Sequence, residues 1–220
     1  MVYIKSYEAP PFDTREILRY AGVRSAAPDM LALLEDCLAE VNGKLTYKAC
    51  WQIFPIQKGP ETWNLTFTET ASASLQKHLR GCDRIAVFAA TVGLELDRLI
   101  ARYGRTSPAK ALMLQAIGAE RIEALCDLVC LDLAGIAGEN GRQTASRFSP
   151  GYGDLPLEMQ KDIFRVLDCP RKIGLSLNES LLMSPSKSVT ALVGMGEADC
   201  EQASGCKTCD KQNCSFRGTK

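Results

Sequence analysis

CDRIAVFAATVGLELD, residues 82–97, is the stretch that decides the fold of this 220-residue chain. Its middle part, RIAVFAAT, is a compact apolar run that ends in a polar residue, and this pattern favours a central strand of a sheet. After Gly93 the sequence LELDRLIARYG takes on the spacing of a helix. The stretch therefore predicts a central strand that is followed directly by a helix.

Upstream, two segments alternate between apolar and polar residues as half-buried strands do. KLTYKACWQIF, residues 44–54, places its apolar residues on one face, and TWNLTFT, residues 62–68, does the same. We expect the two to pair as antiparallel strands across the connection PIQKGPE. Helices are expected over residues 13–22 and 28–43, and a short one from about residue 71 to 81.

Downstream, the longest helix is expected over residues 107–136, where Ser107 is placed to cap the first turn. A shorter amphipathic helix over residues 155–168 comes next, and two strand candidates follow at 172–177 and 188–194. The strands do not alternate regularly with helices. The sequence therefore predicts an α+β fold with a largely antiparallel, twisted sheet.

Length and composition favour one main domain with an appendage. Apolar residues make up 46% of the chain, which is enough for one sizeable core. We expect a single domain over residues 1–195. Within it, residues 1–80 would form N-terminal helices and a hairpin, and residues 82–194 the core. Residues 196–220 are expected to be a cysteine-rich tail.

Charge and motifs argue against several classes of function. Lys plus Arg and Asp plus Glu number 26 each, so the net charge gives no reason to expect nucleic acid or an anionic membrane as a partner. No apolar run is long enough to cross a bilayer and the N-terminus lacks an apolar leader, so we expect a cytoplasmic protein. The one histidine, His78, has no partner histidine for a metal site, and no glycine-rich phosphate loop is found. We assign no catalytic residue.

RFSPGYGD, residues 147–154, is the segment richest in chemistry. It can be a plain turn, because Pro fixes one backbone dihedral and Gly permits a positive φ. It can also be a ligand site, because arginine presents donors suited to a carboxylate, glycine lets a backbone approach closely, and tyrosine offers a flat face and a hydroxyl. Such a set suits an amino acid or a nucleoside.

Four blocks, in this order along the chain, resemble the activation domain of cobalamin-dependent methionine synthase. CDRIAVFAATVGLELD is similar to the strand and Thr-x-Gly turn of the family's free-standing members, and AERIEALCDLV is similar to the helix that carries an acidic residue at the ligand site. Arg147-Phe-Ser-Pro-Gly151-Tyr152 matches the family's Arg-x-x-x-Gly-Tyr signature. LNESLLMSPSKSVTALVG is similar to the segment that follows. The resemblance covers residues 82–194, about half of the chain.

The resemblance implies a module that binds S-adenosylmethionine and supports the reductive remethylation of cobalamin. In the family, oxidised cobalamin takes one electron from a flavodoxin-like donor, and the methyl group of S-adenosylmethionine traps the reduced product. The implied ligand residues are an arginine, an acidic residue facing the cationic ligand, loop residues that shape the pocket, and backbone contacts from the following strand. In this chain they are Arg147, Glu123, Ser149, Pro150, Gly151, Tyr152, Val193 and Gly194.

The resemblance also implies a partner. The chain has no cobalamin-binding histidine motif and no room for substrate domains, so the cobalamin would be carried by another chain. That chain would be a cobalamin-binding methyltransferase subunit of methionine synthase or of a related corrinoid system. We therefore expect a component of a methyltransferase system and not a complete enzyme.

Four of the ten cysteines gather near the C-terminus, where the activation module of the large enzymes has none. They are Cys200, Cys206, Cys209 and Cys214. Four thiolates suffice for tetrahedral zinc or an iron–sulfur cluster, although the spacing matches neither a zinc ribbon nor a ferredoxin. A reduced tail without metal is the alternative. Besides the reactivation module, a metal or iron–sulfur redox module built on this tail and a purely structural subunit thus stay open.

Overall fold

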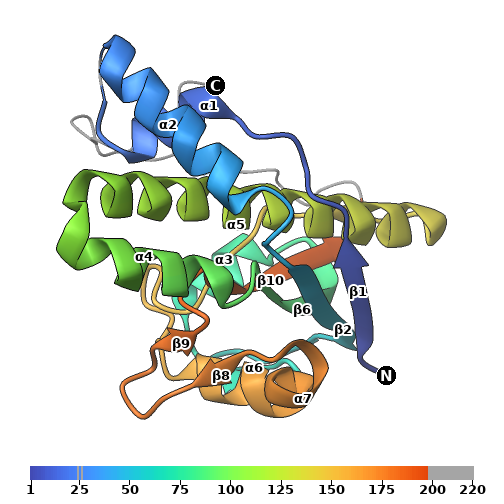
Figure 1. Ribbon diagram of the computed structural model, residues 1–220. Helices are drawn as coiled ribbons and strands as arrows, with labels where there is room; N and C mark the ends of the chain where they lie inside the picture. The colour runs from blue at the N-terminus through green and yellow to red at the C-terminus, as the bar shows by residue number, and fades with distance from the viewer. Residues whose placement is uncertain (24, 26, 198–220) are drawn as a thin grey trace.

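The computed structural model describes residues 1–197 except residues 24 and 26 (Figure 1). Its main sheet has five antiparallel strands in the order β1-β2-β6-β10-β7. These strands are β1 (Tyr3–Tyr7), β2 (Tyr47–Pro55), β6 (Cys82–Thr91), β10 (Ser188–Gly196) and β7 (Gln143–Thr144). The helices are α1 (Thr14–Tyr20), α2 (Pro28–Val41), α3 (Ala73–His78), α4 (Glu95–Thr106), α5 (Pro108–Glu139), α6 (Met159–Leu167) and α7 (Cys169–Ile173). The fold is α+β, as the sequence predicts.

The strand predicted from RIAVFAAT is β6, and it lies at the centre of the sheet. β2 pairs with it along one side and β10 along the other, so Thr91 lies opposite both Lys48 and Ser188. Residues 85–91 are all buried. Because both faces of the strand are covered, its sequence is a continuous apolar run and not an alternation.

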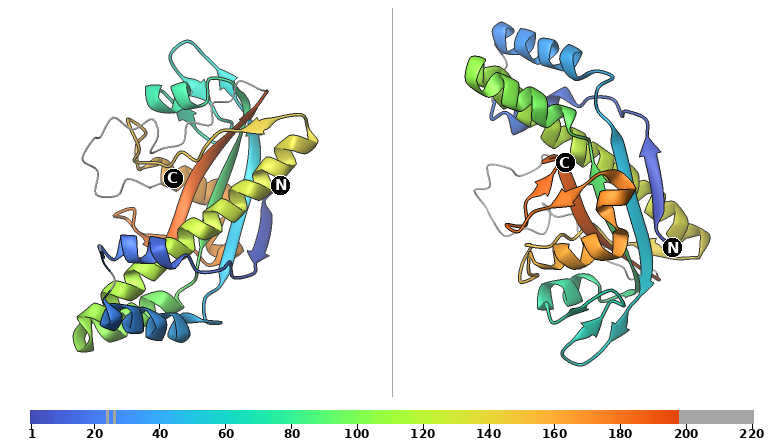
Figure 2. Two further views of the ribbon diagram at one scale, coloured as in Figure 1. Left: turned by 90° about the horizontal axis from the view of Figure 1, so that it is seen from above. Right: turned by 60° about the horizontal axis from the view of Figure 1, so that its bottom comes forward.

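Each face of the sheet is covered by its own helices (Figure 2). The second half of α5 packs on one face, where Cys126 and Val129 belong to the same core as Phe88 of β6. Helices α6 and α7 cover the opposite face, where Ile163 belongs to the same core as Ile85. The sheet therefore forms the middle of three layers.

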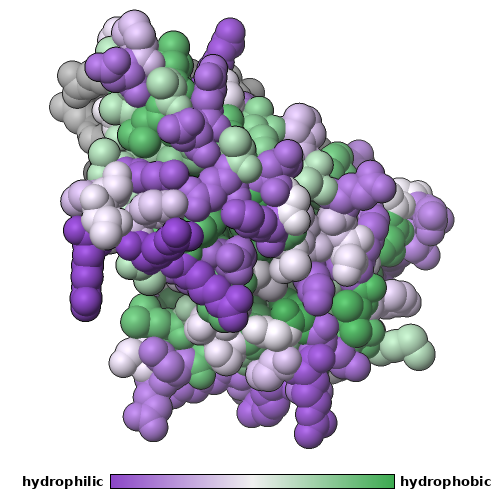
Figure 3. Space-filling model, viewed as in Figure 1, coloured by the Kyte–Doolittle hydropathy of each residue, from purple (hydrophilic) through white to green (hydrophobic). Residues whose placement is uncertain are grey.

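Helices α1, α2 and α4 pack against the first half of α5. Ile17, Leu34, Leu99 and Ile117 belong to this third core. The 32-residue α5 is thus shared between a helical layer and the sheet. On the face seen in Figure 3, apolar side chains reach the surface only in small patches separated by polar ones.

The predicted pairing of TWNLTFT with the strand before it is wrong. Two other neighbours, β1 and β6, flank β2, and only β4 (Trp63–Asn64) of this segment is a strand, in a small sheet with β3 (Gln57–Lys58) and β5 (Glu69–Thr70). The Asn64 side chain accepts a hydrogen bond of 2.7 Å from the Thr66 N–H, and Thr66 has a φ of 74°. This turn ends the strand, although Leu65 and Phe67 are still buried as the alternation requires.

The strand candidate at 172–177 is wrong over most of its length. The chain first forms α7, which has Pro170 in its first turn and Gly174 in the left-handed region at its C-cap. Only β8 (Ser176–Leu177) is a strand, and it pairs with β9 (Met183–Ser184).

Two further details differ from the expectation at the ends of elements. β1 was not expected, because its residues are mostly exposed and show no apolar alternation. Ser107 is at the N-cap of α5, but its side chain makes no capping hydrogen bond.

Candidate functional site

The segment before the Pro-Gly-Tyr turn runs alongside β10 and continues the edge that β7 begins. The Ala145 N–H donates to the carbonyl of Gly194 at 2.9 Å, and Phe148 exchanges backbone hydrogen bonds of 2.9 and 2.8 Å with Leu192. Arg147 lies between these two anchor points. The sheet therefore fixes the backbone from which its side chain projects.

The Arg147 guanidinium reaches α5 and binds two carboxylates there. Its Nη2 donates to Glu123 Oε2 at 3.0 Å and to Asp127 Oδ1 at 3.2 Å. Burial works against the charge on Arg147, but the neighbouring groups outweigh it and raise its pKa. A guanidinium has five N–H donors, and these two bonds come from Nη2 alone. Arg147 thus remains charged, and its guanidinium also lies close to the Cys126 thiol.

The thiols beneath this ion pair are unreactive. Burial raises the pKa of the Cys126 thiol far above its usual value and that of the Cys130 thiol to about 11. Both are therefore neutral at pH 7, and they form the low-polarity floor on which Arg147 lies.

The Ser149-Pro150-Gly151-Tyr152 stretch is a turn, and it leaves the tyrosine accessible. The Tyr152 N–H donates to the Ser149 carbonyl at 3.1 Å. Gly151 has a φ of 89°, which favours glycine. Tyr152 is 61% exposed, and its ring meets Phe148 edge-on. Both interpretations of this segment, as a turn and as a contact surface, are compatible with this geometry.

The structure places Val193 and Gly194 within the sheet. The side chain of Val193 is buried on the α5 side, and the residue lies opposite Ala86. Gly194 lies next to the loop, because its carbonyl oxygen accepts from Ala145. A Cβ on Gly194 would also meet Cys82 Sγ at 2.5 Å, so close packing requires a glycine here.

Helix α1 contributes a residue that the sequence pattern did not single out. The pKa of Tyr20 is raised by burial and then by the negative charge of Glu123, so Tyr20 lies near that carboxylate. The Arg19 guanidinium lies over the Tyr20 ring, 4.4 Å from its centroid. Nothing in the periodicity of residues 13–22 indicates that the end of this helix returns to α5.

A buried ion pair fixes α1 in this position. Arg121 and Glu120 are both buried, and Arg121 Nε donates to Glu120 Oε2 at 2.6 Å. Arg121 Nη2 also donates to the Pro11 carbonyl at 2.8 Å, and Glu120 Oε1 accepts from the Asp13 N–H at 3.2 Å. Since Asp13 caps α1, the pair ties the start of this helix to α5.

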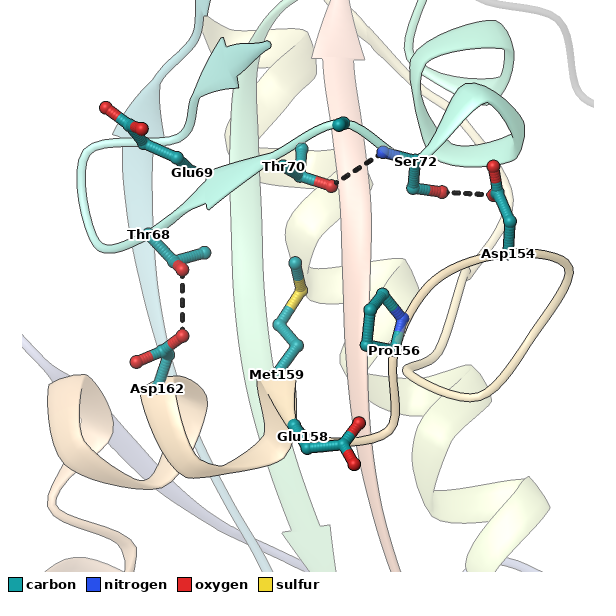
Figure 4. A pocket seen from close by; sticks show the side chains of 10 residues that line it. Thr68, Glu69, Thr70, Ser72, Asp154, Pro156, Glu158, Met159 and Asp162 are labelled. Carbon is teal, nitrogen blue, oxygen red and sulfur yellow. Dashed lines mark hydrogen bonds between the residues drawn. The ribbon is translucent and has the colours of Figure 1, made fainter.

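A pocket of about 420 Å³ opens beside the end of the loop (Figure 4). Its wall includes four carboxylates, those of Glu69, Asp154, Glu158 and Asp162. Asp162 already accepts a hydrogen bond of 2.8 Å from Thr68 Oγ1. Neither Arg147 nor Glu123 lines this pocket, and its acidic wall does not suit a carboxylate ligand.

The four predicted metal ligands, Cys200, Cys206, Cys209 and Cys214, lie outside the described residues. Within the part of the chain that the structure describes, no group of three or more His, Cys, Asp or Glu side chains could hold a metal ion. The other cysteines pack as small apolar groups, and all are buried except the half-buried Cys130.

None of the helices in the described ranges has both the length and the apolar character needed to span a membrane.

The family match and the structural match with known proteins agree with each other. Residues 73–210 match the family described as Vitamin B12 dependent methionine synthase, activation domain. A similar solved structure is the crystal structure of the MetH reactivation domain bound to AdoHcy, with a TM-score of 0.63 and 18% sequence identity. The match covers 88% of this chain and 78% of that one, and at this identity it shows a shared fold. No curated protein matches the chain.

Proposed function

The chain belongs to the family of activation domains of vitamin B12-dependent methionine synthase, and on that premise we propose that it binds S-adenosylmethionine and supports the reductive remethylation of cobalamin. The observation that carries the proposal is the charged Arg147, held at 3.0 Å by Glu123 at the head of the Gly-Tyr turn. The structure of the MetH reactivation domain was solved with AdoHcy bound. AdoHcy is the product that S-adenosylmethionine becomes when it gives up its methyl group.

The charges of this face complement those of the ligand. S-adenosylmethionine carries a carboxylate, an ammonium and a sulfonium group. Arg147 offers donors to the carboxylate, and Glu123 and Asp127 offer negative charge to the two cationic groups. One guanidinium and two carboxylates thus match one anionic and two cationic groups.

The turn and the neighbouring strand would complete the site. Tyr152 is exposed and can pack against a flat nucleoside, while Gly151 allows the chain to approach the ligand closely. Ser149 and Pro150 shape the turn. Val193 and Gly194 would contribute backbone contacts at the point where the loop meets β10.

The methyl acceptor would be a cobalamin on a partner chain, a cobalamin-binding methyltransferase subunit. When bound there, the cobalt centre supplies the one-electron and methyl-transfer chemistry. A flavodoxin-like protein is the proposed electron donor. The residues of this chain would hold the methyl donor with its sulfonium group oriented toward that acceptor.

Equilibrium binding tests the proposal. Calorimetry with S-adenosylmethionine should show binding to the wild-type protein, and Arg147→Ala should weaken it by about 1.5–3 kcal/mol, or about 10-fold to 150-fold. Arg147→Lys keeps the charge but loses the fork of donors, so its affinity should lie between the two. Arg171→Ala, which removes an 86% exposed arginine outside the loop, is the matched control. A folded wild-type protein that does not bind at millimolar ligand contradicts the proposal.

The cysteine-rich tail is proposed separately as a metal site. Cys200, Cys206, Cys209 and Cys214 would hold zinc or an iron–sulfur cluster in the reducing cytoplasm, where thiols stay free to bind metal. Anaerobic purification followed by elemental analysis and visible absorption should find about one zinc per chain, or about two to four irons per chain with the absorption of an iron–sulfur cluster. Protein free of both metals contradicts this part and leaves the ligand proposal untouched.

A further inference from the structure

The loop of residues 146–154 is bound at its far end to the start of α3. Asp154 Oδ2 accepts from the Ala73 N–H at 2.7 Å, and Oδ1 accepts from the Ser74 N–H at 3.0 Å. Oδ1 also accepts from Ser72 Oγ at 2.5 Å, the bond drawn in Figure 4. These bonds, with Ser72 as the largest cause, hold the pKa of Asp154 well below its usual range. The carboxylate is therefore ionised, and it caps the first turn of the helix.

The loop also packs closely against this first turn. A Cβ on Gly153 would lie 2.5 Å from Ser74 Oγ, and Gly153 has a φ of 57°. A glycine is therefore needed where the loop passes the helix.

The near end of the loop is bound to the other end of the same helix. The Nε2 atom of His78, the last residue of α3, lies 2.7 Å from the carbonyl oxygen of Ser146 and donates a hydrogen bond to it. The imidazole packs on Phe148 with ring centroids 5.1 Å apart, and Phe148 meets Tyr152 at 6.2 Å. His78 thus contacts the residues on both sides of Arg147.

The helix between these two contacts is anchored in the core. Leu75 and Leu79 are fully buried in the cluster on the α6 side of the sheet. A helix of six residues has little stability of its own. Leu75, the C-cap residue Leu79 and the loop at its two ends therefore hold it in place, and it holds the loop in return.

We propose that α3 is a positioning element, in which His78 and Asp154 fix the two ends of the loop so that Arg147 and Tyr152 meet the ligand together. The inference rests on the proposed function of this loop as the S-adenosylmethionine site. Residues that present a ligand need such support, because a shift of about 1 Å is enough to weaken a site.

Two removals and their conservative partners test the proposal. His78→Phe keeps a ring on Phe148 but loses the donor, whereas His78→Gln keeps an N–H donor. Asp154→Ala removes all three hydrogen bonds to the start of α3, whereas Asp154→Asn keeps an acceptor. Lys77→Gln, at an exposed position on the same helix, and Glu158→Gln, at an exposed carboxylate of the neighbouring pocket, are the controls.

Three measurements separate positioning from general stability. They are amide hydrogen exchange of residues 146–154 without ligand, the Kd for S-adenosylmethionine, and the Tm. His78→Phe and Asp154→Ala should each speed exchange of the loop and raise the Kd by about 5-fold to 10-fold. His78→Gln and Asp154→Asn should recover most of this loss, and the two controls should match the wild type.

Several outcomes overturn the proposal. Exchange of the loop that is unchanged in His78→Phe and Asp154→Ala would show that α3 does not hold it. Faster exchange at an unchanged Kd would show that the conformation of the loop does not affect ligand binding. An equal loss of affinity in His78→Gln and His78→Phe would exclude the hydrogen bond of His78 as the cause. If the wild-type protein itself does not bind S-adenosylmethionine, the proposed function fails, and the exchange data still decide whether α3 holds the loop.

Discussion

At the scale of single residues, Gly151 combines a backbone requirement with a position in the proposed ligand site. Its φ of 89° disfavours any side chain, so Gly151→Ala should cost about 1–2 kcal/mol of stability. Gly141 has a φ of 66° and open space around it, so Gly141→Ala carries a similar strain. Chemical denaturation should show similar losses in both variants, but only Gly151→Ala should weaken S-adenosylmethionine binding. Equal affinities in the two would show that Gly151 serves the turn alone.

Substitution of Arg121 should strongly reduce the stability of the fold, because Arg121 is fully buried with a charged partner. Arg121→Met leaves Glu120 buried without its cation, and we expect a loss of about 3–5 kcal/mol in the free energy of unfolding. The double variant Arg121→Met with Glu120→Gln removes both charges and should recover part of this loss. A double-mutant cycle by urea denaturation measures the coupling, and additive losses would contradict it.

At the residue scale, the sequence predicts some residues of the candidate site and misses others. The motif and the resemblance single out Arg147 and Glu123, and the structure places their side chains 3.0 Å apart. Their role in binding a ligand stays a prediction. Asp127 and Tyr20 were missed, because Asp127 is one of many charges on a long helix and the approach of Tyr20 depends on how α1 packs on α5. Such contacts follow from tertiary packing and leave no local pattern.

At the scale of elements, two glycines of α5 should respond to alanine in opposite ways. A Cβ on Gly118 would lie 2.2 Å from Leu96 Cδ2 and 2.9 Å from two carbons of Lys187, whereas Gly135 has nothing within 4 Å. Alanine gains about 1 kcal/mol of helix propensity at either site. At Gly118 the overpacking of α4 against α5 should outweigh this gain, at a cost of about 1–3 kcal/mol.

Thermal unfolding of the two variants checks this prediction. Gly135→Ala should raise the Tm and Gly118→Ala should lower it. A higher Tm for Gly118→Ala would show that Leu96 and Lys187 can move aside at little cost.

The elements that the sequence predicts well are those whose burial is uniform along their length. β6 is covered on both faces and α5 carries a long periodic pattern, so both are visible in the sequence. Segments that change conformation within a few residues are not visible. The positive φ of Thr66 ends one expected strand, and the left-handed Asp168 starts a helix where another strand was expected. Few residues other than glycine adopt such angles, so the pattern gives no warning.

At the scale of the whole molecule, several carboxylates make the folded state sensitive to acid. Arg142 lowers the pKa of Asp83, Lys110 lowers that of Glu40, and Ser72 is the largest cause of the lowered pKa of Asp154. Each of these groups binds a proton more readily in the unfolded chain, so the stability it contributes is present above its unfolded pKa of about 4 and is lost as the pH falls below it. We expect the free energy of unfolding to be nearly constant from about pH 7 to 5 and to decline steadily below that.

Urea denaturation at a series of pH values measures this dependence. Glu40→Gln should reduce the slope below about pH 4, since it removes one of the titrating groups. Stability that is constant down to about pH 3 would exclude these carboxylates as the cause.

The central position of β6 has a consequence for the synthesis of the protein on the ribosome. Thr91 and Ser188 are neighbours in the sheet but are 97 residues apart in the chain. At a synthesis rate of about 5–20 residues per second, β10 emerges roughly 5–20 s after β6. During that interval the nascent chain carries an apolar strand whose second edge has no partner, which is the kind of surface that chaperones cover. The central position of β6 thus makes the nascent chain a substrate for chaperones until β10 has been synthesised.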